Sequence, residues 1–126
     1  MSNAAAEWVV GSLLTRGKTA GQNILTTASD DTDIICQGDS RLSVEVDMAG
    51  AAAGDLTVQV IPFEADAATL LGIALAPIRS TGPTLVGGRV VYTADFDVSG
   101  FDKVRFRMTN NNVGTQVVNR KSWRLS

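Results

Sequence analysis

Hydrophobic and polar residues alternate along several stretches of this chain, most clearly between residues 41 and 48. Apolar side chains occupy every second position there, namely Leu42, Val44, Val46 and Met48. Successive side chains of a β-strand point to opposite faces of its sheet, whereas a helix would scatter these residues around its circumference. The pattern therefore predicts an antiparallel strand with one buried and one exposed face.

Four other stretches carry the same kind of signal. Residues 56–60 and 103–108 alternate strictly between apolar and polar side chains, and residues 115–125 alternate more loosely. Residues 89–98 contain several Val, Tyr and Phe residues, which favour strands. We expect a strand in each of these stretches.

The stretch between residues 64 and 78 allows two interpretations. Residues 64–71 (EADAATLL) contain good helix formers, so a helix that crosses between two sheets is one of them. In the other, a loop precedes a strand at residues 70–78, where large apolar residues alternate with Gly and Ala. We favour the loop and strand.

Turn-forming residues separate the predicted strands at regular intervals. They occur at residues 37–40, 49–54, 82–83, 87–88 and 110–112. Several short strands with such spacing, and no alternation of strands with helices, predict an all-β protein. We expect an antiparallel β-sandwich, jelly-roll-like, with an N-terminal arm.

The first thirty residues differ from the rest in composition. We divide the chain into an N-terminal arm or first strand, residues 1–30, and a β-sandwich domain, residues 31–126. The arm contains apolar side chains that need to be covered: Trp8, Val9, Val10, Leu13 and Leu14. They either belong to a first element of the sandwich or pack on a neighbouring subunit.

The composition is that of one folded domain. The chain has 126 residues, of which 44% are hydrophobic, enough to build a core. Its formal net charge of −2 is too small to imply a nucleic-acid or membrane-surface partner. No apolar run approaches the ~18 residues of a transmembrane helix. We therefore expect no nucleic acid and no membrane among its partners.

Charge is distributed unevenly along the chain. Residues 1–63 contain eight acidic and three basic residues, whereas residues 64–126 contain five acidic and eight basic residues. We expect the two halves to balance each other within one fold, and attraction between neighbouring copies is the alternative.

The sequence lacks the side chains on which common catalytic and metal sites depend. It has no His and a single Cys, Cys36, so a Cys–His nucleophile and a structural zinc site are excluded. Cys36 lies in an apolar run, where we expect a small buried side chain. No spacing selects a catalytic pair of carboxylates. We expect a protein that is not an enzyme and binds no cofactor.

An acidic cluster at Asp30, Asp31 and Asp33 is the one candidate for a metal site. Carboxylates at alternate positions of a loop can bind calcium. The run lacks the spacing, the central Gly and the bidentate Glu of an EF-hand loop. We interpret it as a solvated loop that leads into a strand at Ile34, and we expect no metal.

Basic residues gather toward the C-terminus. Six of them lie close together in sequence: Lys103, Arg105, Arg107, Arg120, Lys121 and Arg124. The first three would share one face of a strand at residues 103–108, and the last three would lie beside them if the final segment formed a neighbouring strand. A solvated face and a protein interface are the main interpretations, since Arg pairs bidentately with carboxylates across interfaces. Nucleic acid is disfavoured because no exposed aromatic residue alternates with these charges.

Aromatic residues raise the alternative of carbohydrate binding, in which an exposed ring forms a stacking platform. The candidates are Trp8, Tyr92 and Trp123. Scattered aromatic residues in a small sandwich are more often part of the core.

The C-terminal sequence VRFRMTNNNVGTQVVNRKSWRLS, residues 104–126, resembles the closing hairpin of small virion structural proteins of tailed bacteriophages. The Ala-, Gly- and Thr-rich composition without His is similar to that of capsid decoration (cement) proteins and small tail proteins. The resemblance covers roughly residues 34–126.

This resemblance implies a non-enzymatic virion protein that assembles in the host cytoplasm. It implies a homo-oligomer, with a trimer favoured, that decorates and stabilises the capsid by binding the major capsid protein or another virion protein. A tail or fibre protein, or a receptor- or carbohydrate-binding module, is the alternative. The candidate interface residues are Trp8, Val9, Leu13, Leu14, Lys103, Arg105, Arg107, Arg120 and Arg124.

Overall fold

The computed structural model of the chain describes residues 16–19, 22–24, 28–66 and 68–126. The described residues are all-β, with nine strands and one short 3-10 helix. The elements are β1 (Arg16–Thr19), β2 (Gln22–Ile24), β3 (Ser29–Ile35), β4 (Arg41–Ala49), η1 (Ala53–Asp55), β5 (Leu56–Pro62), β6 (Arg79–Val86), β7 (Arg89–Asp97), β8 (Lys103–Asn110) and β9 (Gln116–Leu125). The all-β prediction is confirmed.

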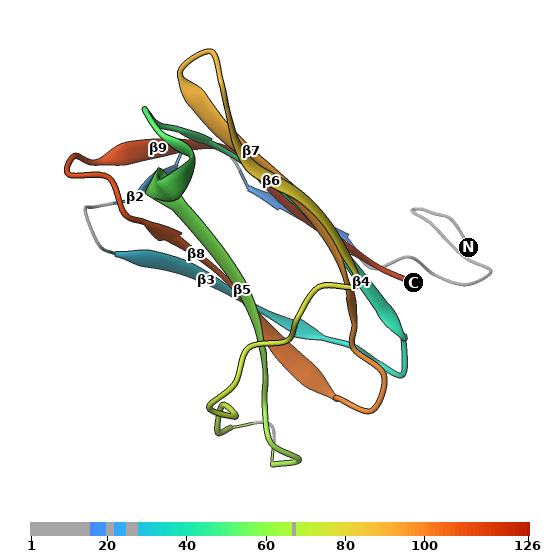
Figure 1. Cartoon of the computed structure of the whole chain (residues 1–126). Coiled ribbons are helices and arrows are strands. Elements are labelled where there is room, and N and C mark those ends of the chain that lie inside the picture. The colour runs from blue at the N-terminus through green and yellow to red at the C-terminus, as the bar shows by residue number, and fades with distance from the viewer. Residues whose placement is uncertain (1–15, 20–21, 25–27, 67) are drawn as a thin grey trace.

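Two antiparallel sheets face each other across the core (Figure 1). The large sheet has the order β1-β9-β4-β7-β6, with β2 also paired to β9, and the small sheet has the order β3-β8-β5. This arrangement confirms the predicted antiparallel sandwich, and the jelly-roll order stays a prediction. The large sheet is the wider one, so its edge strand β6 extends past the cover of the small sheet, and seven of the eight residues of β6 are exposed.

The alternating stretch at residues 41–48 forms β4, at the centre of the large sheet. β4 pairs with β7 on one side and with β9 on the other. Its four predicted inward residues are all buried, and they pack against inward residues of the small sheet. Largest among the fully buried apolar side chains of the core are Phe96, Phe106, Ile34, Leu42, Met48, Met108 and Leu125. Burial of this apolar face drives the two sheets together.

The looser alternation of the last strand has a structural cause. Asp47 of β4 pairs with Arg120 and the next residue, Met48, pairs with Val118, so that β9 carries an extra residue, Asn119. This β-bulge shifts the alternation of side chains between the two faces of β9 by one residue. As a result Val118 and Lys121 both face the core although they are three positions apart.

Lys121 is the charged residue of the core, with a side chain 1% exposed. Its ammonium donates to the Asp30 carbonyl at 2.9 Å, the Asp30 carboxylate at 3.0 Å and the Thr32 hydroxyl at 2.9 Å. It also contacts the Phe106 carbonyl at 3.1 Å and lies 4.7 Å from the centre of that residue's ring. Burial lowers the pKa of Lys121, and the Asp30 carboxylate opposes this shift. The prediction that Lys121 lies beside the basic residues of the neighbouring strand is wrong.

The segment between β5 and β6 is neither the helix nor the favoured strand, so the prediction for residues 70–78 is wrong. Figure 1 shows it as a yellow-green loop that leaves β5 and returns to β6. The Leu71 amide donates to the Pro62 carbonyl at 2.9 Å, and the Leu75 amide donates to the Val60 carbonyl at 2.8 Å. The loop therefore covers part of the free edge of β5, while carrying the chain from the small sheet to the large one.

The predicted turn at Gly82-Pro83 lies inside β6 and is also wrong. Pairing with β7 shifts register between Thr81 and Thr84, so the dipeptide forms a bulge within the strand. Gly82 has a φ of +91°, and a Cβ atom there would lie 2.5 Å from the Val91 carbonyl oxygen. Only Gly can fill this position without displacing β7.

The remaining predictions concern Cys36 and the N-terminal arm. Cys36 is fully buried as predicted, and burial raises the pKa of its thiol to about 11. Four candidate interface residues lie outside the described residues: Trp8, Val9, Leu13 and Leu14. Within residues 1–30, β1 and β2 pair with β9 of the large sheet, and β3 spans the predicted domain boundary.

Replacement of Lys121 tests its role between the sheets. We expect Lys121→Ala to lower the free energy of unfolding by about 3–5 kcal/mol, because it leaves a cavity and uncompensated polar groups. Lys121→Met fills the cavity and should cost roughly half as much. Arg124→Ala, on an exposed position of the same strand, should cost less than about 0.5 kcal/mol. Equal losses in all three variants by urea denaturation would contradict this role.

Candidate functional site

The outer face of the small sheet carries a ladder of ion pairs. Arg107 donates to the two carboxylate oxygens of Asp31 at 2.9 and 3.1 Å, and Arg105 donates to those of Asp33 at 2.7 and 3.1 Å. These cross-strand bidentate pairs join β3 and β8. The hydrogen bonds from Arg107 and Arg105 lower the pKa values of Asp31 and Asp33, respectively.

The acidic cluster is thus a strand and not the expected solvated loop. Asp31 and Asp33 point to the outer face of β3, whereas Asp30 points to the opposite face and binds Lys121. Alternation along the strand splits the three carboxylates between two faces. In the described part of the chain, no group of three or more metal-ligating side chains occurs.

The six C-terminal basic residues do not form one patch. Lys103, Arg105 and Arg107 share the outer face of β8, as predicted. β9 belongs to the large sheet, so Arg120 and Arg124 lie on the opposite side of the sandwich. The expectation of a neighbouring strand is wrong, because β3 and β5 flank β8. An interface role for these residues stays a prediction.

The acidic and basic halves of the chain balance each other inside the fold. Seven ion pairs among the described residues join an acidic residue of the first half to a basic residue of the second half: Asp30–Lys121, Asp31–Arg105, Asp31–Arg107, Asp33–Lys103, Asp33–Arg105, Glu45–Arg120 and Asp47–Arg89. The uneven charge along the sequence therefore reflects pairing between strands that are distant in sequence.

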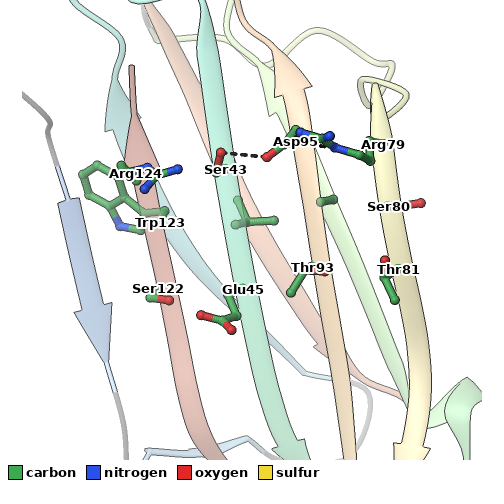
Figure 2. A pocket seen from close by; sticks show the side chains of 12 residues that line it. Ser43, Glu45, Arg79, Ser80, Thr81, Thr93, Asp95, Ser122, Trp123 and Arg124 are labelled. Carbon is green, nitrogen blue, oxygen red and sulfur yellow. Dashed lines mark hydrogen bonds and ion pairs between the residues drawn. The ribbon is translucent and has the colours of Figure 1, made fainter.

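The outer face of the large sheet is polar and hollowed. A shallow pocket of about 780 Å³ lies over β9, β4, β7 and β6 (Figure 2). The Ser43 hydroxyl donates to Asp95 at 2.7 Å, and Arg79 donates to the other Asp95 oxygen at 2.6 and 3.1 Å. The hydrogen bond from Ser43 lowers the pKa of Asp95 most, and those from Arg79 lower it further. Glu45, also in the pocket, pairs with Arg120.

Other polar side chains in this pocket have hydrogen-bonding capacity to spare. Within the described part of the chain, no side-chain hydrogen bond or ion pair engages Thr81, Thr93, Ser122 or Arg124. Trp123 is half-buried and also lines the pocket, whereas Tyr92 is buried in the core. The side chains of both described carbohydrate-binding candidates nevertheless face inward, because Trp123 pairs with the buried Val44 and packs against the core cluster.

A third surface is apolar. Seven large hydrophobic side chains are exposed in the described part of the chain, and five of them lie between residues 71 and 86: Leu71, Ile73, Ile78, Leu85 and Val86. Ile73 is 78% exposed. We call these five exposed side chains the apolar edge. They lie in the loop before β6 and at the C-terminal end of β6, which is the last strand of the large sheet.

The apolar edge was missed at the sequence level because residues 70–78 were expected to form a strand. The polar pocket was missed because its residues come from four strands whose order the sequence does not reveal. Among the described residues, no helix is long and apolar enough to cross a membrane.

Comparisons with known proteins identify similar folds. The sequence matches no protein-family model and no curated protein. The structure of the YomS protein of the SPBc2 prophage has a TM-score of 0.49 and 16% identity, and the alignment covers 94% of this chain and 99% of that one. The enzymatically active domain of tailspike protein 4 of bacteriophage CBA120 has a TM-score of 0.51 and 12% identity.

The alignment with the tailspike structure covers 91% of this chain and 20% of that one. The chain thus spans about a fifth of the tailspike chain's length. At 12% identity, this likeness shows a similar fold and nothing more. Both of these solved structures come from phage-derived proteins.

The ion-pair ladder predicts a loss of stability in acid. The pKa values of Asp31 and Asp33 are lowered in the folded state, so their contribution is complete above the unfolded value near 3.9 and is lost as pH falls below it. We expect the free energy of unfolding to fall between pH 5 and pH 3.

The double variant Asp31→Asn/Asp33→Asn should show a shallower fall, and each replacement should cost less than about 1 kcal/mol at pH 6 because both carboxylates are partly exposed. Asp102→Asn, which replaces an exposed carboxylate outside the ladder, is the matched control. A double variant with the wild-type slope in urea titrations would refute the assignment.

Proposed function

We propose that this chain is a non-enzymatic structural protein of a phage virion that works through protein–protein contacts made by its apolar edge. The exposure of five large hydrophobic side chains on one continuous segment carries the proposal. Scattered exposed apolar residues are ordinary, but a concentration on one surface is typical of an interaction site.

A second copy of the chain is the partner that this surface fits best. Among residues 71–86 only Arg79 is charged, and Asp95 neutralises it. Two apolar edges therefore meet without bringing like charges together, and interfaces between identical subunits are more apolar than other interfaces. Pro83 lacks an N–H, and the bulge at Gly82-Pro83 interrupts the strand edge, so side chains form the contact rather than a continuous β-ladder.

The polar surfaces support a role without catalysis. In the pocket on the large sheet, Asp95 is held by Ser43 and Arg79, and Glu45 is paired with Arg120. The bonds from Ser43 and Arg79 lower the pKa of the Asp95 carboxyl, which makes it a poor proton donor at neutral pH. The outer carboxylates of the small sheet are engaged in the same way.

The likeness to a tailspike domain favours a place in the phage tail over one on the capsid. Decoration of the major capsid protein, by a trimer, is the other arrangement that the C-terminal resemblance implies. In either place the small sandwich contributes buried area at a junction between subunits, and stability follows from that area.

Self-association tests the role of the apolar edge. We expect the wild-type protein to form a homo-oligomer in sedimentation experiments, and Ile73→Asp or Ile78→Asp to shift it to the monomer, because each places a charge in an apolar contact. Ile35→Asp is the matched control, since Ile35 is also exposed, at 61%, but lies outside the apolar edge. A monomeric wild type at all concentrations, or equal loss in the control, would count against self-association.

A place in the virion is tested separately on particles from the native source. We expect antibodies against the chain to label purified particles at one structure, on the tail or on the shell. Purified particles without the chain, by mass spectrometry, would contradict the virion role whatever the oligomeric state.

A further inference from the structure

We propose that the pocket on the outer face of the large sheet binds an acidic oligosaccharide. This site is distinct from the apolar edge, because none of the five side chains of that edge lines the pocket, which opens on the polar face of β9, β4, β7 and β6. It rests on the register of four strands, on the hydrogen-bonding capacity left in the pocket, and on one cation without an ion-pair partner.

The register arranges the polar side chains in two parallel rows across four strands (Figure 2). The first row is Arg124, Ser43, Asp95 and Arg79. The second row is Ser122, Glu45, Thr93 and Thr81. Strands lie about 4.8 Å apart, so each row is roughly 14 Å long and forms a flat platform rather than a narrow hole.

The platform offers the mixture of groups that a polyhydroxylated ligand needs. Sugar hydroxyls both donate and accept, so they are best matched by carboxylate acceptors, guanidinium donors and hydroxyls that do both. The second row supplies the Ser122, Thr93 and Thr81 hydroxyls, none of which has a side-chain partner within the described ranges. They lie around Glu45, whose pairing with Arg120 fixes its carboxylate at the centre of the row.

The first row supplies charge. Asp95 neutralises Arg79 through two hydrogen bonds, and Ser43 fixes the Asp95 carboxylate from the other side. Arg124, at the far end of the row, is exposed and has no ion-pair partner in the part of the chain that the structure describes. A free guanidinium presents a planar fork that binds a carboxylate or sulfate bidentately. The ligand class is therefore a saccharide that carries an anionic group.

Arg124 sets the orientation of the ligand. It stands at the β9 end of the first row, whereas Thr81 ends the second row at β6. Trp123 adds no stacking surface, because it pairs with the buried Val44 and packs against the core, on the opposite face of β9 from Arg124. The anionic group of the ligand thus lies beside Arg124, and its hydroxyls lie along the second row toward β6.

Calorimetric titration with defined oligosaccharides tests this inference. The probes are trigalacturonic acid, sialyllactose, a chondroitin sulfate tetrasaccharide and the neutral maltotriose. We expect at least one acidic probe to bind and maltotriose to bind more weakly. Arg124→Gln should lower the affinity for the acidic probe by about tenfold, because it removes a bidentate charged contact. Arg124→Lys should keep only part of the wild-type affinity. Thr93→Val should weaken it by roughly threefold to tenfold.

Arg89→Gln is the matched control. It changes the net charge equally and removes the ion pair to Asp47, which does not line the pocket. The site is supported if this control keeps the wild-type affinity while Arg124→Gln loses affinity for the acidic probe. Thermal unfolding of each variant should be unchanged. No binding by any acidic probe at millimolar concentration overturns it, as does binding that Arg124→Gln and Thr93→Val leave unchanged. Because Ile73 and Ile78 lie outside the pocket, failure here leaves the association test unaffected.

Discussion

The buried ammonium of Lys121 is the interaction on which the arrangement of the two sheets depends. It extends from β9 in the large sheet to acceptors on β3 and β8 in the small sheet. A buried charge is costly unless it is fully hydrogen-bonded, so only one relative placement of the sheets satisfies it. The bulge at Asn119 makes this possible, because the extra residue turns Lys121 inward together with the apolar Trp123 and Leu125 that follow it.

Around this core, the outer surfaces of the two sheets differ in chemical character. The small sheet is closed by guanidinium–carboxylate pairs between β3 and β8, which neutralise most of its charge. The large sheet presents the Thr81, Thr93 and Ser122 hydroxyls and the Arg124 guanidinium, which have no side-chain partner among the described residues. Its last strand, β6, together with the loop before it, exposes apolar side chains that the small sheet is too narrow to cover. Each surface fits a different kind of contact.

Strand positions could be predicted where alternation is strict, as in β4 and β8, because one face of each is buried. The prediction failed where the chain departs from regular pairing. Residues 70–78 alternate, yet they form an edge cover, and Gly82-Pro83 forms a bulge within a strand. The basic residues were grouped by sequence, whereas the sandwich places Arg105 and Arg124 on opposite sides. Strand order decides such groupings, and local sequence does not encode it.

We propose that the protein assembles through the apolar edge. Hydrogen–deuterium exchange, compared between dilute and concentrated samples, tests it most directly, because amides at an interface exchange more slowly once subunits associate. We expect peptides covering residues 71–86 to become protected on association, while those covering residues 103–107 keep their exchange rates. Protection of residues 103–107 with unchanged exchange at residues 71–86 would contradict it.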